Sequence, residues 1–225
     1  MVGVYEFTGG GRDGVLGRVL GALTGGESPA PETARPDRRA ETTTENSRVR
    51  EPQVAIVPLG DVSTRARRGA VEVIQAVYDC DVGVTEPRPL PEDGYDPERD
   101  QYEAEELVHL AWTVGPGSKN LALTDVDLYL RQRNYVFTAS ASDGGGSVLS
   151  TNRLREDIDD DLGPGATRAV FEDRVRKEAI HAVGGMFGLD RCKTDGCPMG
   201  AAPTPTDIDR KRTLLCGTCR TAIVR

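Results

Sequence analysis

The amino-acid sequence predicts an α/β fold in which helices pack on a mixed, mostly parallel sheet. Short apolar runs such as residues 54–57 and 121–123 are typical of buried strands. Stretches with apolar residues at helical spacing, residues 63–79 and 167–187, lie between or after such runs. Strands that alternate with helices favour parallel pairing through crossover connections. A cysteine-rich tail, residues 192–219, completes the domain.

The first elements follow from local signals. Residues 54–57 form an apolar run that predicts a strand, and this strand is expected to end at Pro58. Ser63 is a suitable N-cap for a helix that continues to about residue 79. Residues 81–85 predict a second strand, and three prolines then force a loop.

The middle of the chain continues this alternation. The pair Asp96-Pro97 predicts the start of a helix over residues 97–113. Residues 121–129 predict a third strand, and residues 135–139 and 148–151 predict two more, joined across the glycines at 144–146. The acidic run at 156–161 is interpreted as a solvated loop before the long helix.

The domain is expected to span residues 53–225, with residues 1–52 as a peripheral extension. Residues 25–52 are rich in Pro, Glu, Thr and Arg and nearly free of large apolar side chains, which predicts a disordered linker. A start codon assigned too early would also explain the extension.

Composition restricts the partners. The net charge is -8, so binding to nucleic acid is disfavoured. No run approaches the length of apolar sequence that crosses a membrane, and the first residues do not resemble a secretory signal, so a cytoplasmic location is expected. Four lysines against 24 arginines indicate either life in concentrated salt, with stability in molar KCl, or a GC-rich genome. The oligomeric state is left open.

Four cysteines form two close pairs: Cys192 and Cys197 are separated by four residues, and Cys216 and Cys219 by two. Such pairs suit four thiolates around one tetrahedral zinc ion, which would supply folding free energy to a tail with few apolar residues. A redox pair at Cys216 and Cys219, two disulfides and an iron–sulfur cluster are weaker alternatives, because no predicted strand precedes the pair and no export signal is present. Cys80 stands alone and is interpreted as a small buried hydrophobic residue.

The residues before and within this tail resemble the archaemetzincins, a family of metzincin-type zinc metallopeptidases. The resemblance covers about residues 53–222 and rests on the following segments: Lys177-Glu178-Ala179-Ile180-His181, Phe187-Gly188-Leu189, the four cysteines with Met199, Asp207-Ile208-Asp209-Arg210-Lys211, Gln101-Tyr102, and the segment 124–128. It implies a metzincin-like fold, a cleft crossed by the long helix, and a structural role for Met199 beneath the zinc site.

The catalytic motif of that family, H-E-x-x-H-x-x-G-x-x-H, is incomplete in this chain. His181 stands at the first ligand position, but Ala182 replaces the glutamate that activates zinc-bound water. Gly185 and Arg191 stand at the second and third ligand positions. One imidazole beside a fixed cation is a poor zinc site.

The sequence therefore predicts a pseudopeptidase that binds one structural zinc, with His181 as a remnant of the catalytic site, and that still binds peptide along an edge strand at 135–139. The first alternative is an active zinc metallopeptidase with altered ligands, with Glu178, Asp190 or His109 as candidates. The second is a zinc-ribbon-like binding module that uses the basic tail residues Arg210, Lys211, Arg212, Arg220 and Arg225.

Overall fold

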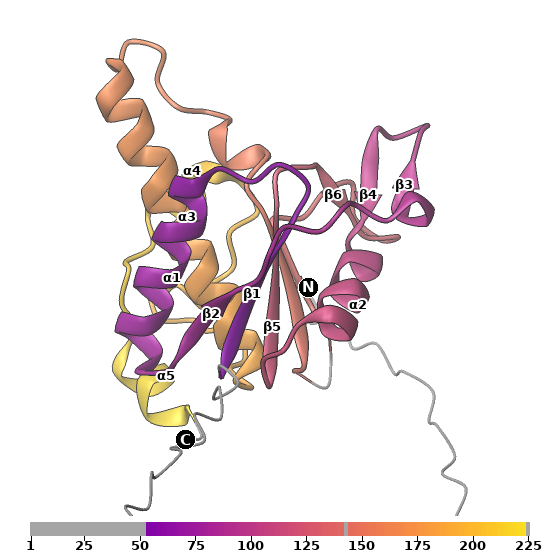
Figure 1. Ribbon diagram of the computed structural model, residues 1–225. Helices are drawn as coiled ribbons and strands as arrows, with labels where there is room; N and C mark the ends of the chain where they lie inside the picture. Colours follow the sequence, from indigo (N-terminus) through magenta and orange to yellow (C-terminus); the bar gives the residue numbers. More distant parts are fainter. Residues whose placement is uncertain (1–52, 142–143, 224–225) are drawn as a thin grey trace, which may run out of the picture. The chain divides into compact units, whose positions relative to one another are not determined.

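A five-stranded sheet lies at the centre of the computed structural model, which describes residues 53–141 and 144–223 (Figure 1). The spatial order is β2 (Val82–Val84), β1 (Val54–Leu59), β5 (Lys119–Thr124), β8 (Gly146–Ser150) and β7 (Thr138–Ser140). The first four strands are parallel and β7 is antiparallel to β8, which confirms the predicted mixed, mostly parallel sheet. The predicted extension at 1–52 lies outside the described residues.

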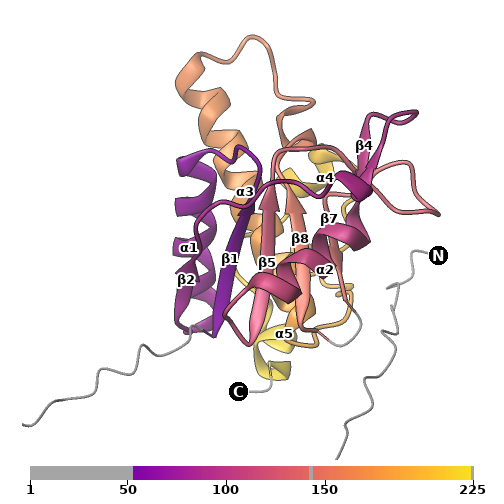
Figure 2. The same ribbon diagram turned by 45° about the vertical axis from the view of Figure 1, so that its right-hand side comes forward.

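Helices cover both faces of this sheet (Figures 1 and 2). The first face packs against α1 (Thr64–Tyr78) and α3 (Pro164–Met186), and the second against α2 (Ala104–Val114). Val54 and Ile56 of β1 belong to the first apolar core, while Val57 and Leu59 belong to the second. Because strand side chains alternate between faces, a strand buried on both sides reads as a continuous apolar run.

The first strand runs through Pro58 instead of ending there, which corrects the expected end. The N–H groups of Val54 and Gly60 donate to carbonyls on the β2 side, from Asp81 and Arg88. The nitrogen of Pro58 faces the same side, beyond the end of β2, where no ladder hydrogen bond is required of it. The proline is thereby tolerated inside a buried strand.

The helix predicted over 97–113 begins only at Ala104, and the expected start is wrong. Asp96 does accept hydrogen bonds from the N–H groups of Glu98 and Arg99, as a helix cap would. The turn then ends at Asp100, whose φ of 54° is left-handed. A small second sheet follows instead, formed by β3 (Tyr95–Asp96), β4 (Gln101–Glu103) and β6 (Leu128–Tyr129), with the 3-10 turn η1 (Glu92–Gly94) before it.

The strand expected over 121–129 is split between the two sheets. The strand β5 ends at Thr124, a turn follows, and β6 pairs with β4. The hairpin expected across the glycines is present as β7 and β8, although β7 begins at Thr138 and not at Tyr135. The 3-10 turn η2 (Arg153–Arg155) leads to the acidic loop, and the long helix follows as predicted.

Buried charges attach α3 to the tail, which contains α4 (Pro205–Asp209) and α5 (Gly217–Ala222). The guanidinium of Arg174 is 1% exposed and donates two hydrogen bonds, of 2.8 and 2.7 Å, to the carboxylate of Asp209. Lys211 and Glu178 form a second pair at 2.8 Å, with side chains 4% and 3% exposed. Asp209 is 39% exposed, so only the pair of Lys211 and Glu178 is removed from water on both sides. The two pairs together define how the tail docks on α3. None of the helices in the described residues could cross a membrane.

Candidate metal centre and the end of the long helix

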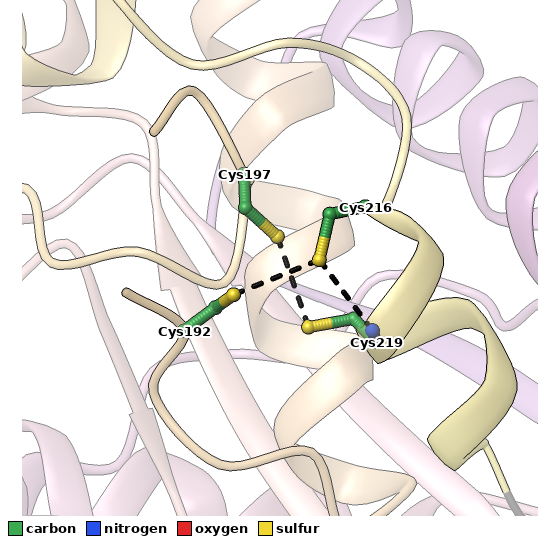
Figure 3. A group of neighbouring side chains, drawn as sticks. All are labelled: Cys192, Cys197, Cys216 and Cys219. Atoms are coloured by element: carbon green, nitrogen blue, oxygen red, sulfur yellow. Dashed lines mark hydrogen bonds between the residues drawn. The ribbon is translucent and has the colours of Figure 1, made fainter. Parts of the chain in front are cut away.

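The four cysteine sulfurs converge between the end of α3 and α5 (Figure 3). The sulfurs of Cys192 and Cys216 are 3.7 Å apart, those of Cys197 and Cys219 are 3.8 Å apart, and all four lie within 4.8 Å of one another. Zn–S bonds of about 2.3 Å in a tetrahedron place two sulfurs about 3.8 Å apart. The four sulfurs are therefore spaced as the ligands of a metal ion would be, and they are free thiols.

Local backbone geometry directs each pair of sulfurs. Gly196 has a φ of 67°, the left-handed conformation that lets the chain turn tightly between Cys192 and Cys197. Cys216 is the N-cap residue of α5, and its sulfur accepts a hydrogen bond from the N–H of Cys219 at 3.5 Å. The pair thus begins a short helix, which the turn-rich tail did not predict, although no strand precedes it.

The four thiols divide into two that ionise readily and two that do not. The N–H of Cys219 lowers the pKa of Cys216 to about 6, and hydrogen bonds from Thr194 lower the pKa of Cys192. Burial raises the pKa of both Cys197 and Cys219. A dication would compensate the buried thiolates, so metal binding and deprotonation are linked at this centre.

The centre is part of the main core and not a separate module. Cys197 and Cys219 are 1% and 6% exposed and pack in the same apolar cluster as α1 and α3. Met199 and Ile208 join them, whereas Leu214 is 67% exposed. The metal centre therefore continues the core that α3 already forms.

His181 lies on α3 beside the cysteine-bearing turn. Its Nδ1 is 3.0 Å from the carbonyl oxygen of Pro198. Burial lowers the pKa of the imidazole, which favours the neutral ring. Because a carbonyl only accepts, Nδ1 carries the hydrogen and Nε2 is left with its lone pair. This is the orientation in which a metal-binding histidine is commonly held.

The two glycines that follow are packing positions. A Cβ on Gly184 would lie 2.4 Å from Met199 Sδ and 2.9 Å from the hydroxyl of Tyr78. That hydroxyl donates to the carbonyl of Ile180 at 2.6 Å, on the helix surface that Gly184 leaves open. A Cβ on Gly185 would lie 3.3 Å from Ser140 Oγ, so α3 approaches β7 closely here. Gly188, with a φ of 78°, ends the helix with a left-handed turn.

The other candidate ligands are not assembled around His181. Glu178 is neutralised by Lys211 in a buried pair. His109 is exposed on α2, which covers the opposite face of the sheet from α3. Asp190 is exposed beside Arg191. Within residues 53–141 and 144–223, the cysteines are the one group of three or more His, Cys, Asp or Glu side chains arranged to hold a metal ion.

Comparison with known proteins agrees with this fold. A sequence model of peptidase family M54 matches residues 100–225. The archaemetzincin of Natronomonas pharaonis is 44% identical over 171 residues, which cover 76% of this chain and 99% of that protein. The archaemetzincin of Haloarcula marismortui is 44% identical over 167 residues, covering 74% of this chain and 96% of that protein.

Solved structures of archaemetzincins have the same fold as this chain. The crystal structure of archaemetzincin from Methanopyrus kandleri superposes with a TM-score of 0.66 at 27% identity, over 76% of this chain and 93% of the other. That of archaemetzincin from Archaeoglobus fulgidus, complexed with malonate, gives 0.64 at 25% identity, over 76% and 99%. These matches place the chain in a class of zinc metallopeptidases built on a mixed α/β sheet. It belongs to peptidase family M54, the archaemetzincins.

Several contacts that organise the site carry no motif in the sequence. Arg174 lies on the buried side of α3 and pairs with Asp209. Nothing in the sequence around Arg174 indicates this pair. The hydrogen bond from Tyr78 to Ile180 spans 102 residues. A signal was present only in the pair Gly184-Gly185, because two glycines inside a helix usually mark a close approach.

Proposed function

We propose that this archaemetzincin is catalytically degenerate: it keeps the family fold and one structural zinc at Cys192, Cys197, Cys216 and Cys219, and it does not hydrolyse peptides. The observation that carries this proposal is the set of side chains along the catalytic motif. Only His181 offers a metal ligand there, and Ala182, Gly185 and Arg191 offer none.

The environment of these positions supports the same conclusion. Ala182 is 1% exposed within the apolar core and carries no group that could accept a proton. Gly185 is close to Ser140, and a side chain there would have to displace the serine hydroxyl. Arg191 carries a fixed positive charge that opposes a dication nearby.

Peptide binding is the activity that such a protein would retain. The strand β7 is the last strand of the five-stranded sheet in the described part of the chain, so one of its backbone edges is unpaired by that sheet. An extended peptide added to this edge gains main-chain hydrogen bonds without any catalytic group. The residues that lead into β7, from Tyr135, are those that the sequence proposed for this role.

Metal content and hydrolysis test the proposal together. Protein purified without added zinc should contain one zinc per chain by elemental analysis, and the His181→Ala variant should contain the same amount. Neither protein should cleave a quenched fluorescent peptide library above the rate of a metal-stripped control. Two zinc ions per chain, or hydrolysis that His181→Ala abolishes, would contradict degeneracy.

An active peptidase with altered ligands is the second candidate, and the orientation of His181 favours it. Nδ1 faces the carbonyl of Pro198, so Nε2 is available to a metal. A zinc ion bound there would polarise a peptide carbonyl and acidify a bound water. The remaining ligands would have to come from the substrate or from outside the described residues.

A zinc-ribbon-like binding module has less support. Arg210 pairs with Asp207, Lys211 is buried against Glu178, and Arg212 donates to the carbonyls of Asp195 and Gly196. These contacts leave few tail cations for a nucleic acid. A cytoplasmic location, where thiols stay reduced, and adaptation to concentrated salt remain part of this proposal.

A further inference from the structure

The strand β2 ends the five-stranded sheet on the side opposite β7, and its outer edge is unpaired in the described part of the chain (Figure 1). On the inner side, the carbonyl of Asp81 accepts from the first residue of β1, and the N–H of Thr85 donates to the carbonyl of Ile56 at 3.0 Å. Alternate residues of a parallel strand bond to the same neighbour. The N–H and C=O groups of Val82 and Val84 therefore face the open edge.

A cavity of about 380 Å³ lies beside this edge, on the face of the sheet that α1 covers. Val84 is aligned with Ile56, which belongs to the core beneath α1, so the valine side chain points to the same face. This side chain is 46% exposed and offers apolar surface to an added strand. The cavity is lined by Thr64, Arg67, Arg68, Val71, Glu72 and Val84.

Arg67 is the cation of this cavity that has no carboxylate partner among the described residues. Arg68 pairs with Glu72 on the same helix at 3.6 Å. Arg67 instead donates to the hydroxyl of Thr64 at 3.1 Å, and its Nε is buried without a hydrogen-bond partner in the described chain. Two guanidinium groups and one carboxylate leave the lining with one net positive charge.

The carboxylates around the cavity do not cancel this charge. Glu172 is already engaged by Arg65 at 3.6 Å and by Arg176 at 3.9 Å. The acidic residues at 79–81 lie at the opposite, amino end of β2, and Glu86 is exposed outside the lining. The first turn of α1 carries no acidic residue, so the positive end of the helix dipole adds to the field. An anion is therefore favoured beside the carboxyl end of β2.

We propose that the edge of β2 binds an extended segment of another protein, and that an acidic side chain of this segment contacts Arg67. Main-chain hydrogen bonds to Val82 and Val84 extend the sheet, and alternate side chains of the segment reach the cavity. There a carboxylate pairs with the guanidinium while apolar groups contact Val71 and Val84. A second copy of this chain fits less well, because its own β2 presents only two valines on this face. The surface is separate from β7, so the inference does not depend on the peptide binding proposed there.

Binding of matched fluorescent peptides tests this surface. The zinc-loaded full chain is titrated, at the lowest KCl that keeps it folded, with the peptide Thr-Val-Thr-Glu-Thr-Val-Thr, blocked at both ends, and with the same peptide carrying Gln in place of Glu. The Glu peptide should bind about three- to tenfold more tightly, because it gains a charge-assisted hydrogen bond. Molar KCl should reduce this preference, since salt screens the charges.

Variants with opposite expected effects separate charge from folding. Arg67→Gln should remove most of the preference for Glu, whereas Glu72→Gln frees Arg68 and should increase it. Arg168→Gln changes an exposed arginine on α3 outside the cavity and should leave the preference unchanged. Val84→Pro removes an N–H that faces the open edge and should weaken the binding of both peptides. If that variant does not fold, a peptide with N-methyl groups on consecutive residues decides, because it cannot pair with the edge and should not bind.

Amide hydrogen exchange locates the bound peptide. The peptide should protect residues 82–84 and leave residues 138–140 of β7 unchanged. Protection confined to β7 would overturn this inference and support the peptide binding proposed above. Protection of residues 82–84 before peptide is added would also overturn it, with a second copy as the occupant if the protection depends on protein concentration. Equal affinity for the two peptides, a preference that survives Arg67→Gln, or no binding would overturn the recognition of an acidic segment.

Discussion

Replacing Gly184 by alanine sets helix propensity against packing within the same residue. In an exposed helix, alanine is better than glycine by about 1 kcal/mol. At Gly184, however, the added Cβ would lie 2.4 Å from Met199 Sδ and 2.9 Å from the hydroxyl of Tyr78. The methionine has to move, and the hydrogen bond from Tyr78 to Ile180 has to lengthen or break.

The magnitudes favour packing. Overpacking a core position costs about 1–3 kcal/mol, and loss of a buried hydrogen bond costs about 1 kcal/mol more. After the propensity gain is subtracted, Gly184→Ala should destabilise the protein by about 1–3 kcal/mol. For a domain of this size, each kcal/mol corresponds to a fall in Tm of about 2–4 °C.

Urea unfolding at fixed KCl and fixed zinc measures this difference. Gly165→Ala is the matched control, because it lies in the same helix and its Cβ would meet nothing within 4 Å. The control should be neutral or slightly stabilising. Met199→Ala should relieve the clash, so the double variant with Gly184→Ala should be more stable than the sum of the single effects. If Gly184→Ala is as stable as the wild type, the packing argument is refuted.

Three further predictions concern the metal centre and its support. Cys216→Ser should bring zinc well below one per chain by elemental analysis and lower Tm, whereas Cys80→Ser, outside the centre, should keep its zinc; unchanged stability of Cys216→Ser would show that the centre matters less for folding. Lys211→Met leaves the carboxylate of Glu178 buried without its partner and should cost about 3–5 kcal/mol in urea unfolding. The double variant with Glu178→Met should recover most of that loss, and a failure to recover would indicate that the lysine acts through other contacts. Zinc affinity should fall as the pH is lowered, because Cys197 and Cys219, whose pKa burial raises, must lose protons to bind the ion, and it should fall more steeply below about pH 6, where Cys216 is protonated as well. Zinc titrations against a competing chelator at several pH values measure this, and an affinity that does not change with pH would contradict it.

Periodicity and capping signals predicted the parts of the fold that depend on local sequence. Ser63 caps α1 as expected, with its side chain accepting from the N–H of Ala66. The long helix and the hairpin before it also follow from spacing. The error at Asp96 arose because its side chain caps a single turn as readily as a helix. Pairing with β6, a long-range contact, decides that residues 101–103 are extended.

The candidate site also has a part that follows from local sequence and a part that depends on long-range contacts. The spacing of the cysteines was enough to place four sulfurs around one point, because turns of four or fewer residues fix each pair. The partners of α3 could not be read from the sequence. In the sequence, Glu178 is a candidate metal ligand near His181. Only the docked tail shows that its carboxylate forms an ion pair with Lys211. Buried ion pairs between distant segments carry no periodic signal.

The turn at residues 197–199 joins two sites that have different chemistry. Cys197 presents its sulfur to the metal centre, and the next residue, Pro198, presents its carbonyl to Nδ1 of His181. Loss of the ion would free this turn and with it the constraint on the imidazole tautomer. The tautomer of His181 should therefore depend on whether the four cysteines hold a metal ion. The chain has two histidines, and the other one is exposed on α2, so the ring-nitrogen resonances of His181 should report by NMR whether the four cysteines hold their metal.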